Sequence, residues 1–111
     1  MPHKETAFSG HGYTPDAIRE YKEDFAFLVR EQVQQLQPLT GALKVELRIY
    51  RAKKSATSRN FGDLDNLAKP ILDAVTMAGA VWVDDRQIVD LHICKFLAAE
   101  PLVEITVQEL A

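Results

Sequence analysis

Residues 42–52 read ALKVELRIYRA, and the alternation in this stretch decides the fold class. From 43 to 49 every second residue is leucine, valine or isoleucine, and charged residues fill the positions between them. A period of two places these two sets of side chains on opposite faces of an extended chain. The stretch therefore predicts a strand with one buried face.

Helices are predicted on both sides of this strand. Residues 14–36 carry apolar side chains at three- and four-residue steps, with Thr14 as N-cap and Pro15 at the first helical position. Residues 66–79 carry a second apolar stripe. The small, polar and basic residues 52–62 are expected to form a flexible loop.

The remaining chain predicts a sheet. Residues 80–83 are expected to form a short strand or extended link, and 87–98 and 102–110 two further strands. This order of helices and strands predicts an α+β fold. We expect a two-layer single domain in which a mixed or antiparallel sheet packs against two helices.

Composition agrees with one globular domain: of 111 residues, 47 % are hydrophobic and 26 % charged. Residues 1–12 hold few apolar side chains and are expected to be a flexible segment before a domain at 13–111. No apolar run approaches the ~20 residues of a membrane span, and the N-terminus lacks the apolar core of a signal peptide. Cys94, in an apolar stretch, is expected to be a buried strand residue of a cytoplasmic protein.

The net charge of −3 argues at first against a nucleic-acid partner. Between Lys44 and Arg59, however, six basic residues accompany one acid, Glu46. The charge is polarised along the chain, so the overall acidity does not exclude a polyanion.

Two aspartates stand two residues apart in FGDLDNLAK, residues 61–69. On a helix, Asp63 and Asp65 would diverge by about 200°, whereas in an extended segment they share a face. The flanking glycine and asparagine favour an extended backbone up to Asn66, which we expect to be the helix N-cap. The two carboxylates are then predicted to converge.

Converging carboxylates need a cation, because two unit charges about 4 Å apart repel by about 4 kcal/mol at an effective dielectric constant of 20. Oxygen ligands without a histidine or cysteine cluster fit Mg²⁺ or Mn²⁺ better than zinc. The stretch VWVDDRQIVD, residues 81–90, adds Asp84 and Asp85 beyond the second helix.

Structural explanations stay open for the same residues. In the structural explanation, Asp63 or Asp65 is a helix cap, and Asp84 with Asp85 forms a turn. Lys69 either forms an ion pair with Asp65, which stabilises the helix by only a few tenths of a kcal/mol, or stabilises negative charge that develops on a phosphate. D-x-D phosphohydrolases and nucleotide-sugar transferases are an alternative class, but the phosphohydrolase motif follows a hydrophobic strand and here the loop-like SRNFG precedes it.

The segment DLDNLAKPILDAVTMAGAVWVDDRQIVD, residues 63–90, resembles the core signature of the RusA family of Holliday junction resolvases, endonucleases typical of phages and prophages. The shared pattern is D-x-D-N opening a helix, a lysine one turn later, D-A-[LV], a glycine, a tryptophan- or valine-containing stretch and D-D. The resemblance extends loosely back through 43–50 to Tyr13. It implies a metal-dependent endonuclease that cuts four-way DNA junctions symmetrically in recombination and repair.

The same resemblance implies the site residues. Asp63, Asp65 and Asp85 would hold Mg²⁺ or Mn²⁺, with Asp84 as the fallback third ligand and Lys69 as the catalytic lysine. The residues that would hold DNA phosphates are Arg51, Lys53, Lys54 and Arg59, with Arg86 as a further candidate that otherwise neutralises Asp85. Two symmetric cuts by a small chain imply a two-fold homodimer.

Two departures from the family pattern stand out. Members begin with a strand and a basic turn, and we expect both to be missing here because the chain starts almost at GHGYTP, residues 10–15. The stretch AGAVWVDD, residues 78–85, is one residue longer than in some members, which blurs Asp84 against Asp85. A missing strand would favour the alternative function, a DNA-binding or assembly protein that has lost nuclease activity.

Overall fold

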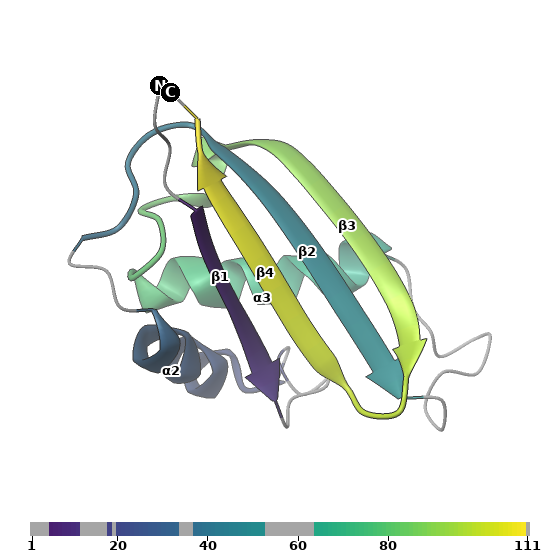
Figure 1. The fold of residues 1–111 in the computed structure, drawn as a ribbon. Helices are drawn as coiled ribbons and strands as arrows, with labels where there is room; N and C mark the ends of the chain where they lie inside the picture. Colours follow the sequence, from purple (N-terminus) through teal and green to yellow (C-terminus); the bar gives the residue numbers. More distant parts are fainter. Residues whose placement is uncertain (1–4, 12–17, 19, 34–36, 53–63, 111) are drawn as a thin grey trace.

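A computed structural model describes residues 5–11, 18, 20–33, 37–52 and 64–110. Its elements are β1 (Glu5–His11), α2 (Lys22–Gln32), β2 (Leu43–Ala52), α3 (Leu64–Ala78), the 3₁₀ helix η1 (Asp85–Gln87), β3 (Ile88–Ala98) and β4 (Leu102–Glu109). The strands form one sheet in the order β1-β4-β2-β3, and both helices cover the same face of it (Figure 1). The predicted two-layer α+β fold is confirmed.

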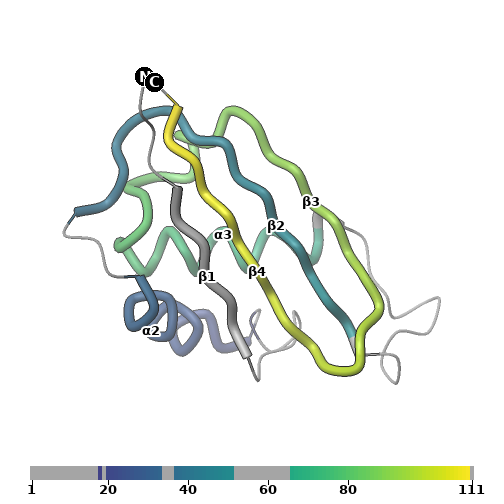
Figure 2. Tube along the Cα trace, in the orientation of Figure 1, coloured from purple at the N-terminus to yellow at the C-terminus, as the bar shows by residue number. Residues whose placement is uncertain are grey.

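The sheet is mixed because one of its three strand pairs is parallel. β2 runs parallel to β3 and antiparallel to β4, which also pairs antiparallel with β1. The short connection from β3 to β4 passes the end of β2, as Figure 2 shows, so consecutive strands enclose a third between them. The 3₁₀ helix η1 leads directly into β3.

The first strand is present, contrary to prediction. Residues 5–11 form β1 and pair with β4 from Glu5 opposite Gln108 to His11 opposite Leu102. Composition predicted a loose segment because these residues carry few large apolar side chains. The strand forms through backbone pairing with a segment nearly one hundred residues later, which local composition does not report.

The alternation that predicted β2 is confirmed and continues further than expected. Leu43, Val45, Leu47 and Ile49 are all fully buried on the helix-covered side. The pattern then includes Arg51, whose side chain is only 4 % exposed. The largest fully buried side chains in the described chain are Trp82, Phe25, Ile18, Leu43, Leu47, Ile49, Ile71 and Ile105.

The predicted helix over 14–36 is interrupted in the structure: Ile18 and Glu20 are helical, but the chain leaves the helix at Tyr21 before α2. Tyr21 leaves the helical region, with φ −125° and ψ 49°, so α2 begins at Lys22, and Val33 is extended after its end. Residues 14 and 15, the predicted cap and first turn, lie outside the described residues. The first turn of α2 carries Glu23 and Asp24, which favours the positive end of the helix dipole.

The second helix begins earlier than predicted. α3 starts at Leu64, so Asp65 and Asn66 are helical and the expected N-cap at Asn66 is wrong. Leu64 stands three, four and seven residues before Leu67, Ala68 and Ile71, so starting there extends the apolar stripe by one residue. The extended backbone that was expected to make the aspartates converge is therefore absent at Asp65.

Two other predictions concern the burial of Cys94 and the presence of membrane-spanning helices. Cys94 lies in a strand as expected, but it is exposed, because its position in β3 is on the face of the sheet that the helices leave open. Among the described residues, the helices are too short or too polar to cross a membrane.

Candidate active site

A pocket of about 320 Å³ opens between the start of α2 and the first half of α3. It is lined by Lys22, Asn66, Lys69, Pro70 and Asp73. The four residues from α3 follow the three- and four-residue spacing of one helix face. Lys22 Nζ lies 3.3 Å from Asp73 Oδ2, so an ion pair joins the two helices at the pocket.

Lys69, the predicted catalytic lysine, is exposed at this pocket. Asp65 lies four residues earlier in α3, one helical turn away. The side chain of Asp65 and the whole of Asp63 lie outside the described residues. The approach of these two carboxylates to each other stays a prediction.

The second acidic pair stands at η1, where Asp84 and Asp85 have different surroundings. Asp84 is the N-cap: its Oδ1 accepts a hydrogen bond from the Arg86 backbone N–H at 2.9 Å. The Arg86 guanidinium donates to Asp84 Oδ2 through Nε at 3.1 Å and Nη2 at 2.9 Å. These bonds from Arg86 lower the pKa of Asp84 to about 2 and raise the pKa of Arg86. The side chain of Arg86 is therefore committed to Asp84.

Gln87 holds η1 in place, and sequence reasoning missed it. Its Oε1 accepts hydrogen bonds from the N–H groups of Val83 and Asp84 at 2.8 and 2.9 Å. Its Nε2 donates to the carbonyls of Leu39 and Gly41 at 3.0 and 2.9 Å. One amide thus ties the acidic turn to the loop before β2. The capping-box spacing of Asp84 and Gln87 was the available sequence cue.

The two acidic regions lie at opposite ends of α3. From Leu64 to Ala78 the helix makes 14 steps of ~1.5 Å, so it is about 21 Å long. It begins on the side of β3 and ends toward α2, from where the chain turns back to η1 (Figure 1). Trp82 Nε1 donates to Thr76 Oγ1 at 2.7 Å and fixes this return to the last turn of α3. Within the described part of one chain, no three carboxylate, histidine or cysteine residues gather into a metal site.

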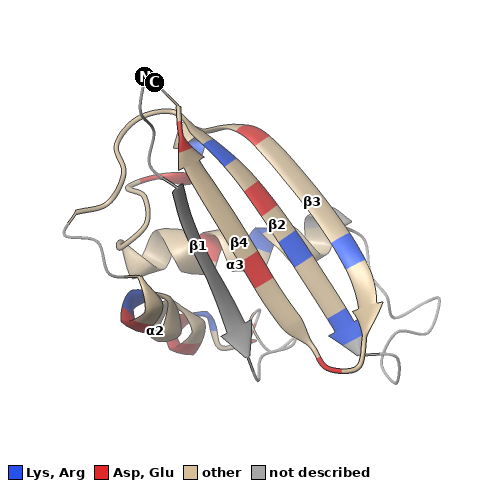
Figure 3. Ribbon diagram, viewed as in Figure 1, with Lys and Arg blue, Asp and Glu red and all other residues tan. Residues whose placement is uncertain are grey.

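The predicted DNA-binding residues lie only in part within the described chain. Arg51 is only 4 % exposed, on the helix-covered side, so its contact with DNA stays a prediction that this burial does not favour. Arg48 points to the open face, where it pairs with Glu46 and, at 3.2 Å, with Glu104. Figure 3 shows acidic and basic residues alternating along β2. The side chains of Lys53, Lys54 and Arg59 lie outside the described residues.

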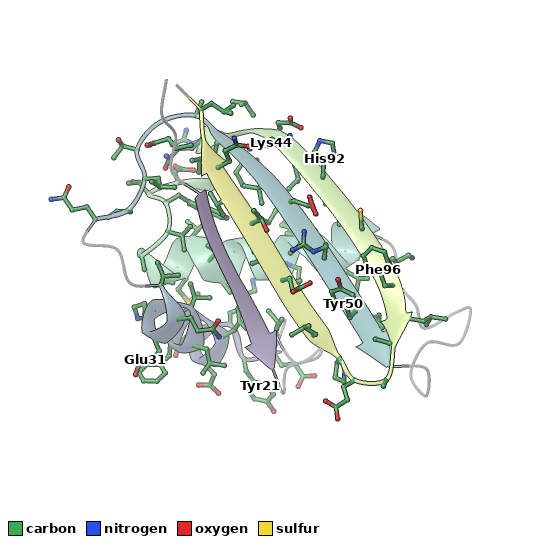
Figure 4. All side chains as sticks on the ribbon, viewed as in Figure 1. Tyr21, Glu31, Lys44, Tyr50, His92 and Phe96 are labelled. Atoms are coloured by element: carbon green, nitrogen blue, oxygen red, sulfur yellow. The ribbon has the colours of Figure 1, made fainter. Side chains whose placement is uncertain are left out.

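The open face of the sheet carries a polar network and a pair of aromatic rings. Tyr50 and Phe96 stack across β2 and β3 with centroids 5.1 Å apart and planes at 24° (Figure 4). A hydrogen bond from Tyr50 lowers the pKa of Glu104, and the same bond raises the pKa of Tyr50. Because cations and carboxylates are paired here, the face does not form a basic surface.

Comparison with known proteins decides the family. The family model of endodeoxyribonuclease RusA matches residues 2–108. The chain belongs to the RusA family. A RusA crossover junction endodeoxyribonuclease of Escherichia coli K12 is 37 % identical over 70 residues, which cover 62 % of this chain and 55 % of that protein. The homologue from Enterobacteria phage 82 matches to the same extent.

Another relative is aligned over more of the chain, but its name states no activity. The uncharacterized protein YqaN of Bacillus subtilis is 28 % identical, over 86 % of this chain and 77 % of its own length. The alignments with the RusA enzymes, by contrast, cover about half of the length of those proteins. The family membership itself was predicted from residues 63–90, and the matched range confirms it.

For a RusA-family chain, the structure adds two residues that were not predicted as site residues, although one of them, Asp73, is the aspartate of the D-A-[LV] motif. Lys22 and Asp73 complete the pocket around Lys69. Asp73 stands four residues after Lys69, and this spacing was visible in the sequence. Lys22 comes from a different helix, so only the tertiary packing of α2 on α3 identifies it.

Proposed function

We propose that this chain is a divalent-metal-dependent endonuclease that cuts four-way DNA junctions symmetrically. The observation that carries the proposal is the pocket at the first half of α3, which contains Lys69 one turn after Asp65 in a RusA-family chain. The crossover junction activity named for its relatives supports the choice of substrate. The cutting is proposed to act in DNA recombination and repair.

The donor atoms of the proposed site suit a hard cation. Asp63, Asp65 and Asp85 supply carboxylate oxygens, which fit Mg²⁺ or Mn²⁺. Asp85 is preferred over Asp84, because Asp84 already caps η1 and pairs with Arg86. Arg86 is accordingly proposed to orient the acidic turn, with DNA contact a secondary part of its function.

When bound, the metal would lower the pKa of a water molecule and stabilise the leaving oxyanion of the phosphodiester. Lys69 contributes a positive charge beside the phosphate, where negative charge grows as the bond breaks. Its exposed position on α3 leaves the ammonium accessible to a DNA backbone. Lys53, Lys54 and Arg59 are proposed to hold further phosphates, a contact that is independent of sequence and sensitive to salt.

The length of α3 has a consequence for this site. Helix α3, about 21 Å long, lies between Asp65 and Asp85 along the chain, so carboxylates from two copies that meet on one ion at about 2.0–2.1 Å would fit this fold. We therefore propose that Asp63 and Asp65 of one copy are joined by Asp85 of the partner copy. Two such sites in a two-fold dimer would make the paired cuts.

The strand β3 offers a surface for this homodimer. It is an edge strand of the sheet. Val89, Leu91, Phe96 and Leu97 on it are between 40 % and 65 % exposed. Edge strands with exposed apolar residues are usually covered in native proteins, which supports burial of this edge by a second copy.

Cleavage of a synthetic four-way junction tests the proposal. The protein is incubated with the junction in Mg²⁺, in Mn²⁺ or in EDTA, beside a linear duplex of the same sequence. Paired, metal-dependent cuts confined to the junction are expected. Equal cutting of the linear duplex, or cutting in EDTA, would contradict it.

Binding without cutting, by a folded dimer in either metal, would instead favour the alternative of a binding or assembly protein. The reason for that alternative was the expected loss of the first strand. Because residues 5–11 form β1, that reason no longer holds.

A further inference from the structure

Lys22 occupies a position on α2 where the fold would be served by an apolar residue. Phe25, Ala26 and Val29 lie three, four and seven residues after it in α2, and all three are buried. Lys22 therefore lies on the core-facing stripe of the helix. Its side chain is 33 % exposed and points toward α3.

The helix dipole also disfavours a lysine at this position. Lys22 is the first residue of α2, where the positive end of the helix dipole favours acidic side chains over basic ones. Tyr21, the N-cap, makes no side-chain capping bond that would offset this. Lys22 thus departs from both the apolar pattern and the charge preference of its helix, and such departures are typical of functional positions.

The ion pair with Asp73 does not by itself explain Lys22. A partly exposed ion pair contributes little to stability, and the two side chains here are 33 % and 35 % exposed. The pocket also contains Lys69, which stands one turn before Asp73 on α3. Among the described residues that line the pocket, two ammonium groups accompany one carboxylate, which is a net positive charge.

We propose that Lys22 is a second phosphate-binding cation of the pocket that contains Lys69, and that Asp73 is the positioning residue that holds it there. The ligand is a backbone phosphate of the DNA substrate, so the inference rests on the proposed function. An ammonium group has three donors. Lys22 can keep one on Asp73 and direct the others to non-bridging phosphate oxygens.

Junction binding in EDTA separates this contact from chemistry. Dissociation constants are measured by fluorescence anisotropy across a range of salt concentrations for the wild type, Lys22→Gln and Lys44→Gln. Lys44 is a matched control, because it is an exposed lysine on the open face of β2. Lys22→Gln is expected to bind several-fold more weakly and to lower the salt slope by about 0.9, the value for one lost phosphate contact. Lys44→Gln is expected to keep the wild-type slope.

Two further variants test the assigned parts. Lys22→Arg is expected to restore most of the affinity. As a single substitution, Asp73→Asn is expected to weaken junction binding. Combined with Lys22→Gln, it is expected to cause no further loss, because a positioning residue acts only through the lysine that it holds. Tighter binding by Asp73→Asn would overturn the positioning part, since it would mean that Asp73 only repels the phosphate.

The outcomes separate the inference from the function on which it rests. If the wild type cuts the junction and Lys22→Gln binds it like Lys44→Gln, the inference fails and the proposed function stands. A wild type that neither binds nor cuts overturns both. Thermal unfolding of each variant is measured alongside, and Lys22→Gln is expected to stay folded because the ion pair it loses is partly exposed.

Discussion

Arg86 binds Asp84 and not its neighbour Asp85, with the guanidinium Nη2 2.9 Å from Asp84 Oδ2 and the Arg86 backbone N–H on the same carboxylate. The sequence alone does not distinguish these two aspartates, but the structure does. Asp84 caps η1 and pairs with Arg86, whereas Arg86 leaves the Asp85 carboxylate for another role. This division has consequences for mutation and for pH.

Replacing Asp85 is expected to be far more damaging to cleavage than replacing Asp84. Loss of a group that only supports a metal ligand already costs about 10- to 100-fold, so Asp85→Asn is expected to lose more than that in junction cleavage. Asp84→Asn keeps a side-chain oxygen that can cap η1 and loses only the charge that pairs with Arg86, so it should retain most activity. Single-turnover cleavage of both variants, with binding measured in EDTA, checks this. The reverse order of damage would assign the metal to Asp84.

The Asp84 cap is expected to persist into strongly acidic solution. Its pKa is lowered from 3.8 to about 2 by the bonds from Arg86. A lowered folded-state pKa adds stability above the unfolded pKa, and this contribution is lost as the pH falls from about 3.8 toward 2. NMR titration of the Asp84 carboxyl carbon should give a midpoint near 2, and Arg86→Ala should move it back up. An unshifted midpoint in the wild type would mean that the pair does not form in solution.

The sequence predicted much of the fold because its alternation is local. Leu43 to Ile49 were expected to be buried in one strand and are. The same alternation reaches Arg51, but a charged residue next to a basic loop was assigned to the surface, since burial of a guanidinium depends on what covers it. β1 was missed because only pairing with β4 makes it a strand.

The site was less predictable for the same reason. A motif gives the order of Asp65, Lys69 and Asp85 along the chain, but it does not give their distance in space. Sequence spacing indicated that the acids bracket one helix, and the structure adds the bounds of that helix, Leu64–Ala78. Lys22 joins the pocket from α2, to which no sequence motif pointed.

The exposed edge at β3 gives a test of the dimer. Leu97→Lys places a charge at a 54 % exposed position, so it should cost the monomer little, but it should break an apolar interface. Light scattering after size-exclusion chromatography is expected to show a shift to monomer, together with loss of paired cuts. Phe27→Lys is the matched control, since Phe27 is 55 % exposed on α2. A Leu97→Lys protein that stays dimeric would place the interface elsewhere.

Mixing two inactive variants tests whether the metal site spans two copies. Asp65→Asn and Asp85→Asn are each expected to be inactive alone. In a mixed dimer, a shared site leaves one of the two sites with both natural carboxylates, so about a quarter of the wild-type sites should return after random exchange of subunits. The readout is single-strand nicking of the junction by the mixture. If each site is built within one chain, both sites of a mixed dimer carry a substitution and no nicking appears, although subunit exchange, followed by tagged copies, is complete. That result would require α3 or η1 to rearrange so that Asp65 and Asp85 of one chain meet.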